Sequence, residues 1–214
     1  LTEQTQLNFS ASALNYESDK SASLNQQYFT TQVGLAHAFS PLWKASFLIG
    51  PSMTISESSS RQVINIGNGQ RITIGGAEQG TTFGFAARAE TSYQVTDRLT
   101  AGLSYGHAAA PNNSGQLLTA DTIGVNFQQT VISFMDVFLN ANYVKQTGTA
   151  SNSSSNDRDY VNAQPGLRWK ITEQISLDTS YQFSWQKYAS TGASGTSQGG
   201  FLTLNYDFPR WQTF

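Results

Sequence analysis

The stretch "ITEQISLDTSYQFSWQ", residues 171–186, decides the fold. Ile175, Leu177, Thr179, Tyr181, Phe183 and Trp185 occupy every second position, and small or polar side chains stand between them. Successive side chains of a β-strand point to opposite faces, so this period of two predicts a strand with two unlike faces and excludes a helix. A strand at the surface of a soluble sheet has the same pattern, and one strand alone leaves its environment open.

The same period recurs in about ten segments along the chain. They cover residues 7–13, 29–39, 43–55, 83–95, 99–105, 123–131, 137–143, 161–171, 175–185 and 202–208. Short connections such as "FSPLW" (39–43), "VTDRL" (95–99) and "ITEQI" (171–175) alternate with long ones at 17–27, 56–80, 108–116, 146–159 and 188–198. An even number of strands with short turns on one rim and long loops on the other is typical of outer-membrane barrels. The sequence therefore predicts an all-β fold, a closed antiparallel up-and-down transmembrane β-barrel with short periplasmic turns and long extracellular loops, as one domain over residues 1–214.

Composition excludes several classes of protein. Charged residues make up 12% of the 214 residues, about half the usual share of a soluble domain, and the second face of the strands is instead rich in Ser, Asn and Gln. Such a face suits a wet lumen, whereas a soluble sandwich or lipocalin-like barrel usually carries charges outside. The net charge of −2 and the scattered basic residues argue against a nucleic-acid partner. Without cysteine there is no disulfide, thiolate metal site or cysteine nucleophile, and we expect no cofactor.

The carboxy-terminal end of the chain favours the bacterial outer membrane. The N-terminus has no signal-peptide pattern, so an exported chain would be in its mature form. The ending "LNYDFPRWQTF" resembles the carboxy-terminal signal of bacterial outer-membrane proteins, although Phe208, rather than Phe214, keeps the strand period. The predicted surroundings are a lipid bilayer with lipopolysaccharide.

Aromatic residues collect near the ends of the predicted strands. Amphipathic rings prefer the depth of the lipid headgroups, so such residues form girdles at the two membrane interfaces. The candidates are Trp43, Tyr93, Tyr143, Trp169, Tyr181, Trp185, Tyr206 and Trp211.

The alternation in "LTAGLSYGH" (99–107) and "ISLDTSYQFSW" (175–185), with loops of Ser, Asn, Asp and Gly, resembles the β-barrel porins found beside exopolysaccharide export systems. This resemblance implies an outer-membrane location and a role in transport or as an accessory to polysaccharide export.

Few charges fall on the face predicted to line the lumen. A three-residue turn that pairs Ile171 with Ile175 would place Arg168 directly opposite Asp178. Such charges either select ions and solutes or neutralise one another and plug the barrel, and the second interpretation is favoured because an unpaired charge away from water is costly. The candidates are Lys44, Arg88, Glu90, Arg168, Lys170 and Asp178.

The histidines do not form a predicted active site. His107 and Ser104 lie near each other in the sequence but should point to opposite faces, and His37 belongs to the opposite rim. The sequence therefore predicts a protein that is not an enzyme.

A separate hairpin, residues 62–75, is predicted inside the longest loop, with an Asn-Gly tip that suits a type I′ turn. It is either a lid, partner-binding arm or plug, or a strand extension beyond the membrane. Its residues of interest are Val63, Ile64, Ile66, Asn68, Gly69, Ile72 and Ile74.

Two functions remain open. The chain is either a porin-like barrel that passes small solutes or ions or assists polysaccharide export, or a non-conducting structural or adhesive barrel. The second function would act through the loops, through a homo-oligomer or as a subunit of an envelope assembly. An outer-membrane hydrolase is a distant third.

Overall fold

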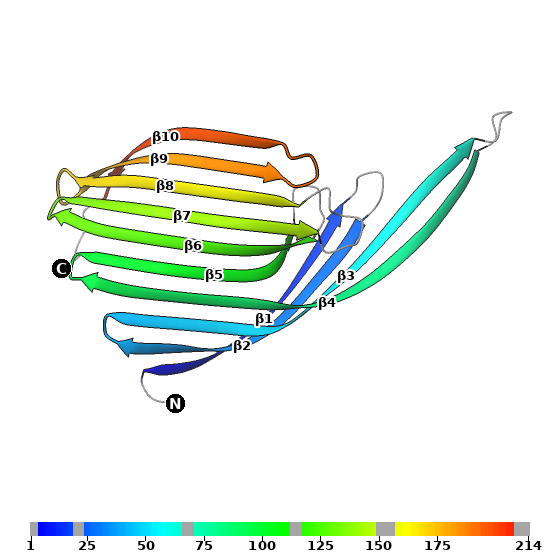
Figure 1. Cartoon of the computed structure of the whole chain (residues 1–214), viewed down its shortest axis with the longest axis horizontal. Helices are drawn as coiled ribbons and strands as arrows, with labels where there is room; N and C mark the ends of the chain where they lie inside the picture. The colour runs from blue at the N-terminus through cyan, green and yellow to red at the C-terminus, as the bar shows by residue number, and fades with distance from the viewer. Residues whose placement is uncertain (1–3, 19–23, 66–70, 112–116, 149–156, 208–214) are drawn as a thin grey trace, which may run out of the picture.

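The computed structural model describes residues 4–18, 24–65, 71–111, 117–148 and 157–207. Ten antiparallel strands follow one another side by side in chain order, and they form one curved up-and-down sheet (Figure 1). No helix in the described ranges is long and apolar enough to cross a membrane. The strands are β1 (Thr5–Ser18), β2 (Leu24–Ser40), β3 (Trp43–Asn65), β4 (Arg71–Thr96), β5 (Leu99–Pro111), β6 (Leu117–Ile132), β7 (Met135–Gly148), β8 (Arg158–Lys170), β9 (Ile175–Tyr188) and β10 (Ser194–Tyr206). The predicted number of strands and their antiparallel order are confirmed.

Short turns join the strands at one end of the sheet, which we call the turn end; the other end is the loop end. Three of these turns begin with a hydroxyl side chain that accepts a hydrogen bond from a backbone N–H two residues later, at 3.2 Å in each case. This is the usual way in which Ser and Thr favour turns. The three residues are Ser40, Thr96 and Thr172.

The two faces of the sheet differ in exposure. Along β1 to β9 the odd-numbered residues form one face, and they include Phe9 and Phe83, which are 73% and 77% exposed. The even-numbered face contains nearly all of the few buried residues, such as Tyr28 and Asp136. The pockets lie mainly against this even-numbered face, so we call it the concave face and the other the convex face.

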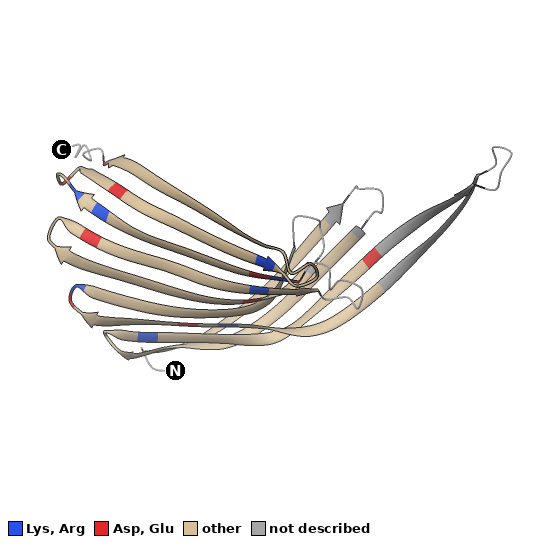
Figure 2. Ribbon diagram, turned by 45° about the horizontal axis from the view of Figure 1, so that its top comes forward, with Lys and Arg blue, Asp and Glu red and all other residues tan. Residues whose placement is uncertain are grey.

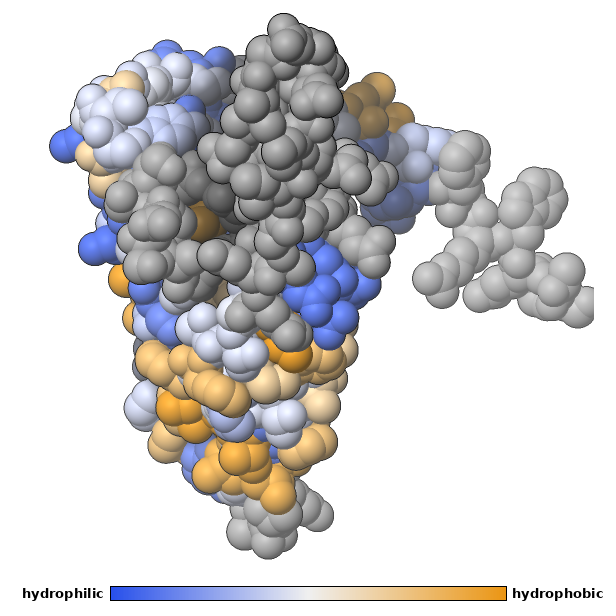
Figure 3. Space-filling view, turned by 90° about the vertical axis from the view of Figure 1, so that its right-hand side faces the viewer, coloured by the Kyte–Doolittle hydropathy of each residue, from blue (hydrophilic) through white to orange (hydrophobic). Residues whose placement is uncertain are grey.

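The large hydrophobic side chains of this protein are therefore not packed into a core. Buried hydrophobic residues in the described part of the chain are limited to Tyr28, Ala86, Ala87 and Leu118. In the view of Figure 3, hydrophobic side chains gather on the lower part of the surface, on the side of the N-terminal strands. Figure 2 shows that charged residues lie mostly near the strand ends, which leaves the middle of the sheet almost uncharged. An apolar, exposed convex face with an uncharged middle is what a strand in a bilayer requires.

The apolar band has the height of a membrane. On β9 it runs from Ile175 to Trp185 on the convex face. Ten residue steps of about 3.3 Å give about 33 Å along the strand, and a tilt of about 40° reduces this to about 25 Å. This equals the height of the outward-facing apolar band of outer-membrane barrels.

One sequence prediction differs from the structure. The region 56–80 was predicted as a long loop, but strands β3 and β4 continue through most of it and pair as far as Asn65 opposite Arg71. Their hairpin projects well beyond the other strands (Figure 1). Closure of the barrel stays a prediction, since among the described residues β1 pairs with β2 and β10 pairs with β9.

Candidate functional site: the polar concave face

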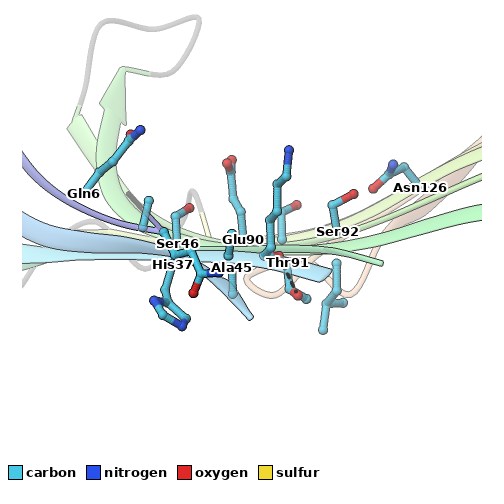
Figure 4. A pocket seen from close by; sticks show the side chains of 14 residues that line it. Gln6, His37, Ala45, Ser46, Glu90, Thr91, Ser92 and Asn126 are labelled. Atoms are coloured by element: carbon cyan, nitrogen blue, oxygen red, sulfur yellow. Dashed lines mark hydrogen bonds between the residues drawn. The ribbon is translucent and has the colours of Figure 1, made fainter. Parts of the chain in front are cut away.

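The concave face is lined by small polar side chains. A hollow of about 620 Å³ lies on it near the turn end of β1 to β6. In Figure 4, Gln6, Glu90 and Asn126 rise from one face of the sheet, whereas His37 lies on the other face. The alternation predicted from the sequence is thus seen directly in the direction of the side chains.

The six predicted charged residues all occupy even-numbered positions of β3, β4, β8 and β9, and five of them form ion pairs. Arg88 donates from Nε to a carboxylate oxygen of Glu90 at 2.7 Å. Arg168 and Asp178 lie opposite each other, as the predicted register requires, and form two parallel bonds of 2.8 Å. Most of the predicted charges on the concave face are therefore neutralised by an ion pair on the same face.

The ion pair of Lys170 involves a residue that sequence reasoning missed. Lys170 Nζ lies 3.0 Å from Asp136 Oδ2, and Asp136 Oδ1 accepts a hydrogen bond of 2.7 Å from the Thr130 hydroxyl. Only 8% of the Asp136 side chain is exposed. Asp136 falls between the predicted strands 123–131 and 137–143, but the even-numbered parity of β7 would have assigned it to the concave face.

Neutral hydrogen bonds fill the space between the ion pairs. The Asn162 amide donates to the Ser184 hydroxyl at 2.9 Å, and the Gln164 amide donates to the Ser180 hydroxyl at 3.1 Å. Asn205 on β10 donates to Asp178 at 3.2 Å, which links the last strand to the charged pair. Amide and hydroxyl groups of this kind can bind water or hydroxylated solutes without adding net charge.

One aromatic ring lies over a glycine on the same face. A Cβ added to Gly166 on β8 would clash with Phe138 Cζ, because the ring of its cross-strand partner covers the glycine. A larger residue at position 166 would therefore have to displace the Phe138 ring on the concave face.

The predicted girdle residues lie on the convex face, in two groups. Trp43, Tyr93 and Trp169 stand at the turn end, and Phe39 stacks on Trp43 with ring centroids 4.3 Å apart. Near the loop end, the Tyr143 hydroxyl donates to Asp159 at 2.8 Å. Trp185 lies on the loop side and Tyr206 at the turn end, and Trp211 lies outside the described residues. Tyr181 lies near the middle of β9, so the structure does not place it in either group.

Neither histidine is positioned to activate Ser104 as a nucleophile. His107 Nδ1 lies 2.7 Å from an Asp121 carboxylate oxygen, and the ring stacks on Phe85 at 4.2 Å, on the convex face. Ser104 lies on the concave face, where its hydroxyl bonds to the Gly124 carbonyl oxygen. His37, at the turn end, bonds to the Thr5 hydroxyl. Within the described ranges no group of His, Asp and Glu has the arrangement of a metal site.

The predicted hairpin residues lie at the far ends of β3 and β4. Val63 and Ile64 on β3 pair with Thr73 and Ile72 on β4, and Ile74 pairs with Gln62. Ile66, Asn68 and Gly69 fall outside the described residues. The hairpin is thus a continuation of the sheet rather than a separate element inside a loop.

Comparison with known proteins identifies the fold. No protein-family model and no curated protein matches the sequence. The outer-membrane channel DcaP of Acinetobacter baumannii superposes with a TM-score of 0.54 at 10% identity, over 92% of this chain and 62% of DcaP. The ferric-catecholate import receptor Fiu of E. coli K12, in its open form, superposes with a TM-score of 0.50 at 12% identity, over 83% of this chain and 30% of Fiu.

The chain therefore has the fold of bacterial outer-membrane β-barrel proteins. Barrels of this class have aromatic girdles at both interfaces and a polar interior. It spans less than two thirds of the length of either of these two proteins.

Proposed function

We propose that this chain forms the wall of a closed porin-like barrel in the bacterial outer membrane and passes small solutes or ions. The observation that carries the proposal is the opposition of the two faces: an exposed apolar convex face and a polar, ion-paired concave face. Its bilayer is proposed to be the lipopolysaccharide-containing outer membrane. The proposed role is transport without catalysis, in agreement with the placement of Ser104 and His107 on opposite faces.

The concave face favours small neutral or weakly charged solutes. Arg88 and Arg168 are paired with carboxylates, so this part of the lumen presents mainly amides and hydroxyls. A solute that carries hydroxyl groups can exchange hydrogen bonds with such a wall, whereas a multiply charged solute finds few uncompensated charges to bind. The resemblance of residues 99–107 and 175–185 to porins beside exopolysaccharide export systems supports an accessory role in polysaccharide export as the finer proposal.

Conductance in a planar lipid bilayer tests this function. Purified protein should give stable unit steps with only weak preference between K⁺ and Cl⁻, because five of the six predicted wall charges are paired. The Gly166→Val variant tests the same path. Its new side chain should displace the Phe138 ring into the lumen and so lower the unit conductance. Absence of steps from protein that shows heat-modifiable gel migration would contradict the transport function.

A second candidate function is supported by the projecting hairpin of β3 and β4. These strands of 23 and 26 residues are longer than any other strand, and their ends stand beyond the sheet. A non-conducting structural or adhesive barrel would use such an arm, or a homo-oligomer, to contact another envelope component. Deletion of residues 60–76 separates the two functions, since it should leave conductance intact and abolish only such contacts.

A further inference from the structure

The convex face of β5 to β9 carries one row of charged residues near the loop end. Each of these five strands is flanked by a neighbouring strand on both sides within this chain. The row consists of cross-strand partners in which basic and acidic side chains alternate, and every other odd-numbered residue of the five strands is uncharged. Its members are His107, Asp121, Lys145, Asp159 and Lys187.

Both lysines of this row lie at the height of the lipid headgroups. Lys145 is ten residues from Met135 at the turn end of β7, and Lys187 is twelve residues from Ile175 at the turn end of β9. At about 3.3 Å per residue and a tilt of about 40°, they lie about 25 Å and about 30 Å above the turn end. The apolar band of outer-membrane barrels is about 25 Å tall. The two lysines therefore lie at its outer boundary or just beyond it.

The two carboxylates of the row accept hydrogen bonds from other residues. Asp121 accepts a bond of 3.0 Å from the Tyr105 hydroxyl and lies 2.7 Å from His107 Nδ1. Asp159 accepts a bond of 2.8 Å from the Tyr143 hydroxyl. Both tyrosines belong to the next row of cross-strand partners toward the middle of the sheet. The carboxylates thus contact the tyrosines on their membrane side.

The two lysines are left without a carboxylate partner. Within the described ranges no carboxylate oxygen lies within 4.0 Å of Lys145 or Lys187, and both side chains are exposed. Lys170 on the concave face, by contrast, lies 3.0 Å from an oxygen of Asp136. Lys145 and Lys187 are the only lysine or arginine residues on the convex face of β5 to β9. Their charges are therefore available to an anion outside the sheet.

An aromatic residue accompanies each lysine on the same face. Tyr143 and Trp185 lie two residues before Lys145 and Lys187, one step nearer the middle of the sheet. Aromatic rings of this kind prefer the depth of the headgroups, and long basic side chains extend from there toward the water. The two lysines are two strands apart, a separation of about 10 Å. Phosphate is the anion that a bilayer presents at this depth.

We propose that Lys145 and Lys187 bind the phosphate groups of an anionic lipid headgroup at the outer boundary of the membrane. In the proposed surroundings of this chain that lipid is lipopolysaccharide. The inference rests on the lipid-facing convex face of the proposed function and adds a ligand to it. Asp159 lies between the two lysines in the row and weakens their attraction for an anion. The binding is therefore reversible and depends on both lysines.

Binding of a defined phosphorylated lipid tests the site. The probe is diphosphoryl lipid A, titrated into the purified chain in detergent and followed by native mass spectrometry. EDTA is present so that no divalent cation can bridge a carboxylate and a phosphate. A basic residue near an anionic lipid surface contributes about 1 kcal/mol, so Lys145→Gln and Lys187→Gln should each weaken the affinity about 5-fold, and the double variant about 25-fold.

Three comparisons make the result specific. Lys44→Gln removes an equal charge from the concave face and should leave the lipid affinity within about 2-fold of the parent value, which is within the error of such a titration. Asp159→Asn removes the intervening carboxylate but keeps an acceptor for the Tyr143 hydroxyl, so it should tighten the binding by up to about 5-fold. Inorganic phosphate at the concentration of the lipid should not displace it, because the acyl chains contribute to binding.

Each result has a defined meaning. Loss of affinity in the double variant, with unchanged affinity in Lys44→Gln and heat-modifiable migration in both, supports the site. Equal affinities of the parent and the double variant overturn it, as does displacement of the lipid by inorganic phosphate. Weaker binding by Asp159→Asn also counts against it. The double variant should conduct like the parent, because its substitutions lie outside the lumen. Channel silence in a parent chain that binds the lipid would contradict the transport function alone.

Discussion

Replacement of Leu139 by arginine tests whether the convex face meets lipid, through its effect on the free energy of unfolding. Leu139 is on the convex face of β7, four residues from Met135 at the turn end and four from Tyr143 near the loop end. Four steps of about 3.3 Å at a tilt of about 40° place it about 10 Å from either interface, close to the midplane. An arginine at the midplane costs about 2–4 kcal/mol, so Leu139→Arg should lower the free energy of unfolding by about 3 kcal/mol. This is a change of roughly 100-fold in the equilibrium between folded and unfolded protein.

The adjacent residue is the matched control. Asn140 points to the concave face, opposite Asn126 and Gln164, where an arginine meets water and polar side chains. Asn140→Arg should change the free energy of unfolding by about 0.5 kcal/mol or less. Urea titration of both variants in phosphatidylcholine vesicles, followed by tryptophan fluorescence, measures the difference. A cost for Asn140→Arg equal to or above that for Leu139→Arg would refute the assignment of the faces.

Substitutions at three further contacts test the structure. Gly166→Ala should destabilise the protein by about 1–3 kcal/mol because the new methyl group meets the Phe138 ring, and Phe138→Ala in the same chain should recover part of the loss in a double-mutant cycle. Asp178→Asn frees Arg168 and should shift the reversal potential toward anion selectivity, whereas Arg168→Gln should shift it toward cation selectivity. The double variant should return to the parent value. Equal reversal potentials in all three variants would show that the pair does not face the permeation path. Thr172→Val removes the acceptor for the Ile175 N–H at 2.9 Å and should cost about 1 kcal/mol in urea titration, with Thr179→Val on the convex face as a control that leaves the turn intact.

Much of this arrangement could be predicted from local pattern, because the period of two assigns each residue to a face wherever a strand continues. Arg168 opposite Asp178 followed from the length of one turn, and the structure contains that pair. Asp136 was missed because the boundary of β7 was placed too late, and boundaries depend on hydrogen bonds to the neighbouring strands. The Ser- and Gly-rich region 56–80 reads as a loop by propensity, yet pairing between β3 and β4 continues through it.

The closure of the sheet could not be predicted from local pattern. It depends on the curvature accumulated over ten strands and on pairing between strands that are distant in the sequence. An even strand count shows only that the first and last of these strands run in opposite directions.

Thiol accessibility along β9 tests most directly whether lipid covers the convex face. Single cysteines from Ile175 to Gln186 are introduced one at a time into the parent chain, reconstituted in vesicles and exposed to a charged, water-soluble maleimide. We predict rapid labelling at even-numbered positions such as Asp178 and Gln182, and protection at odd-numbered positions such as Leu177 and Phe183. Labelling of the odd-numbered positions with protection of the even-numbered ones would contradict the account.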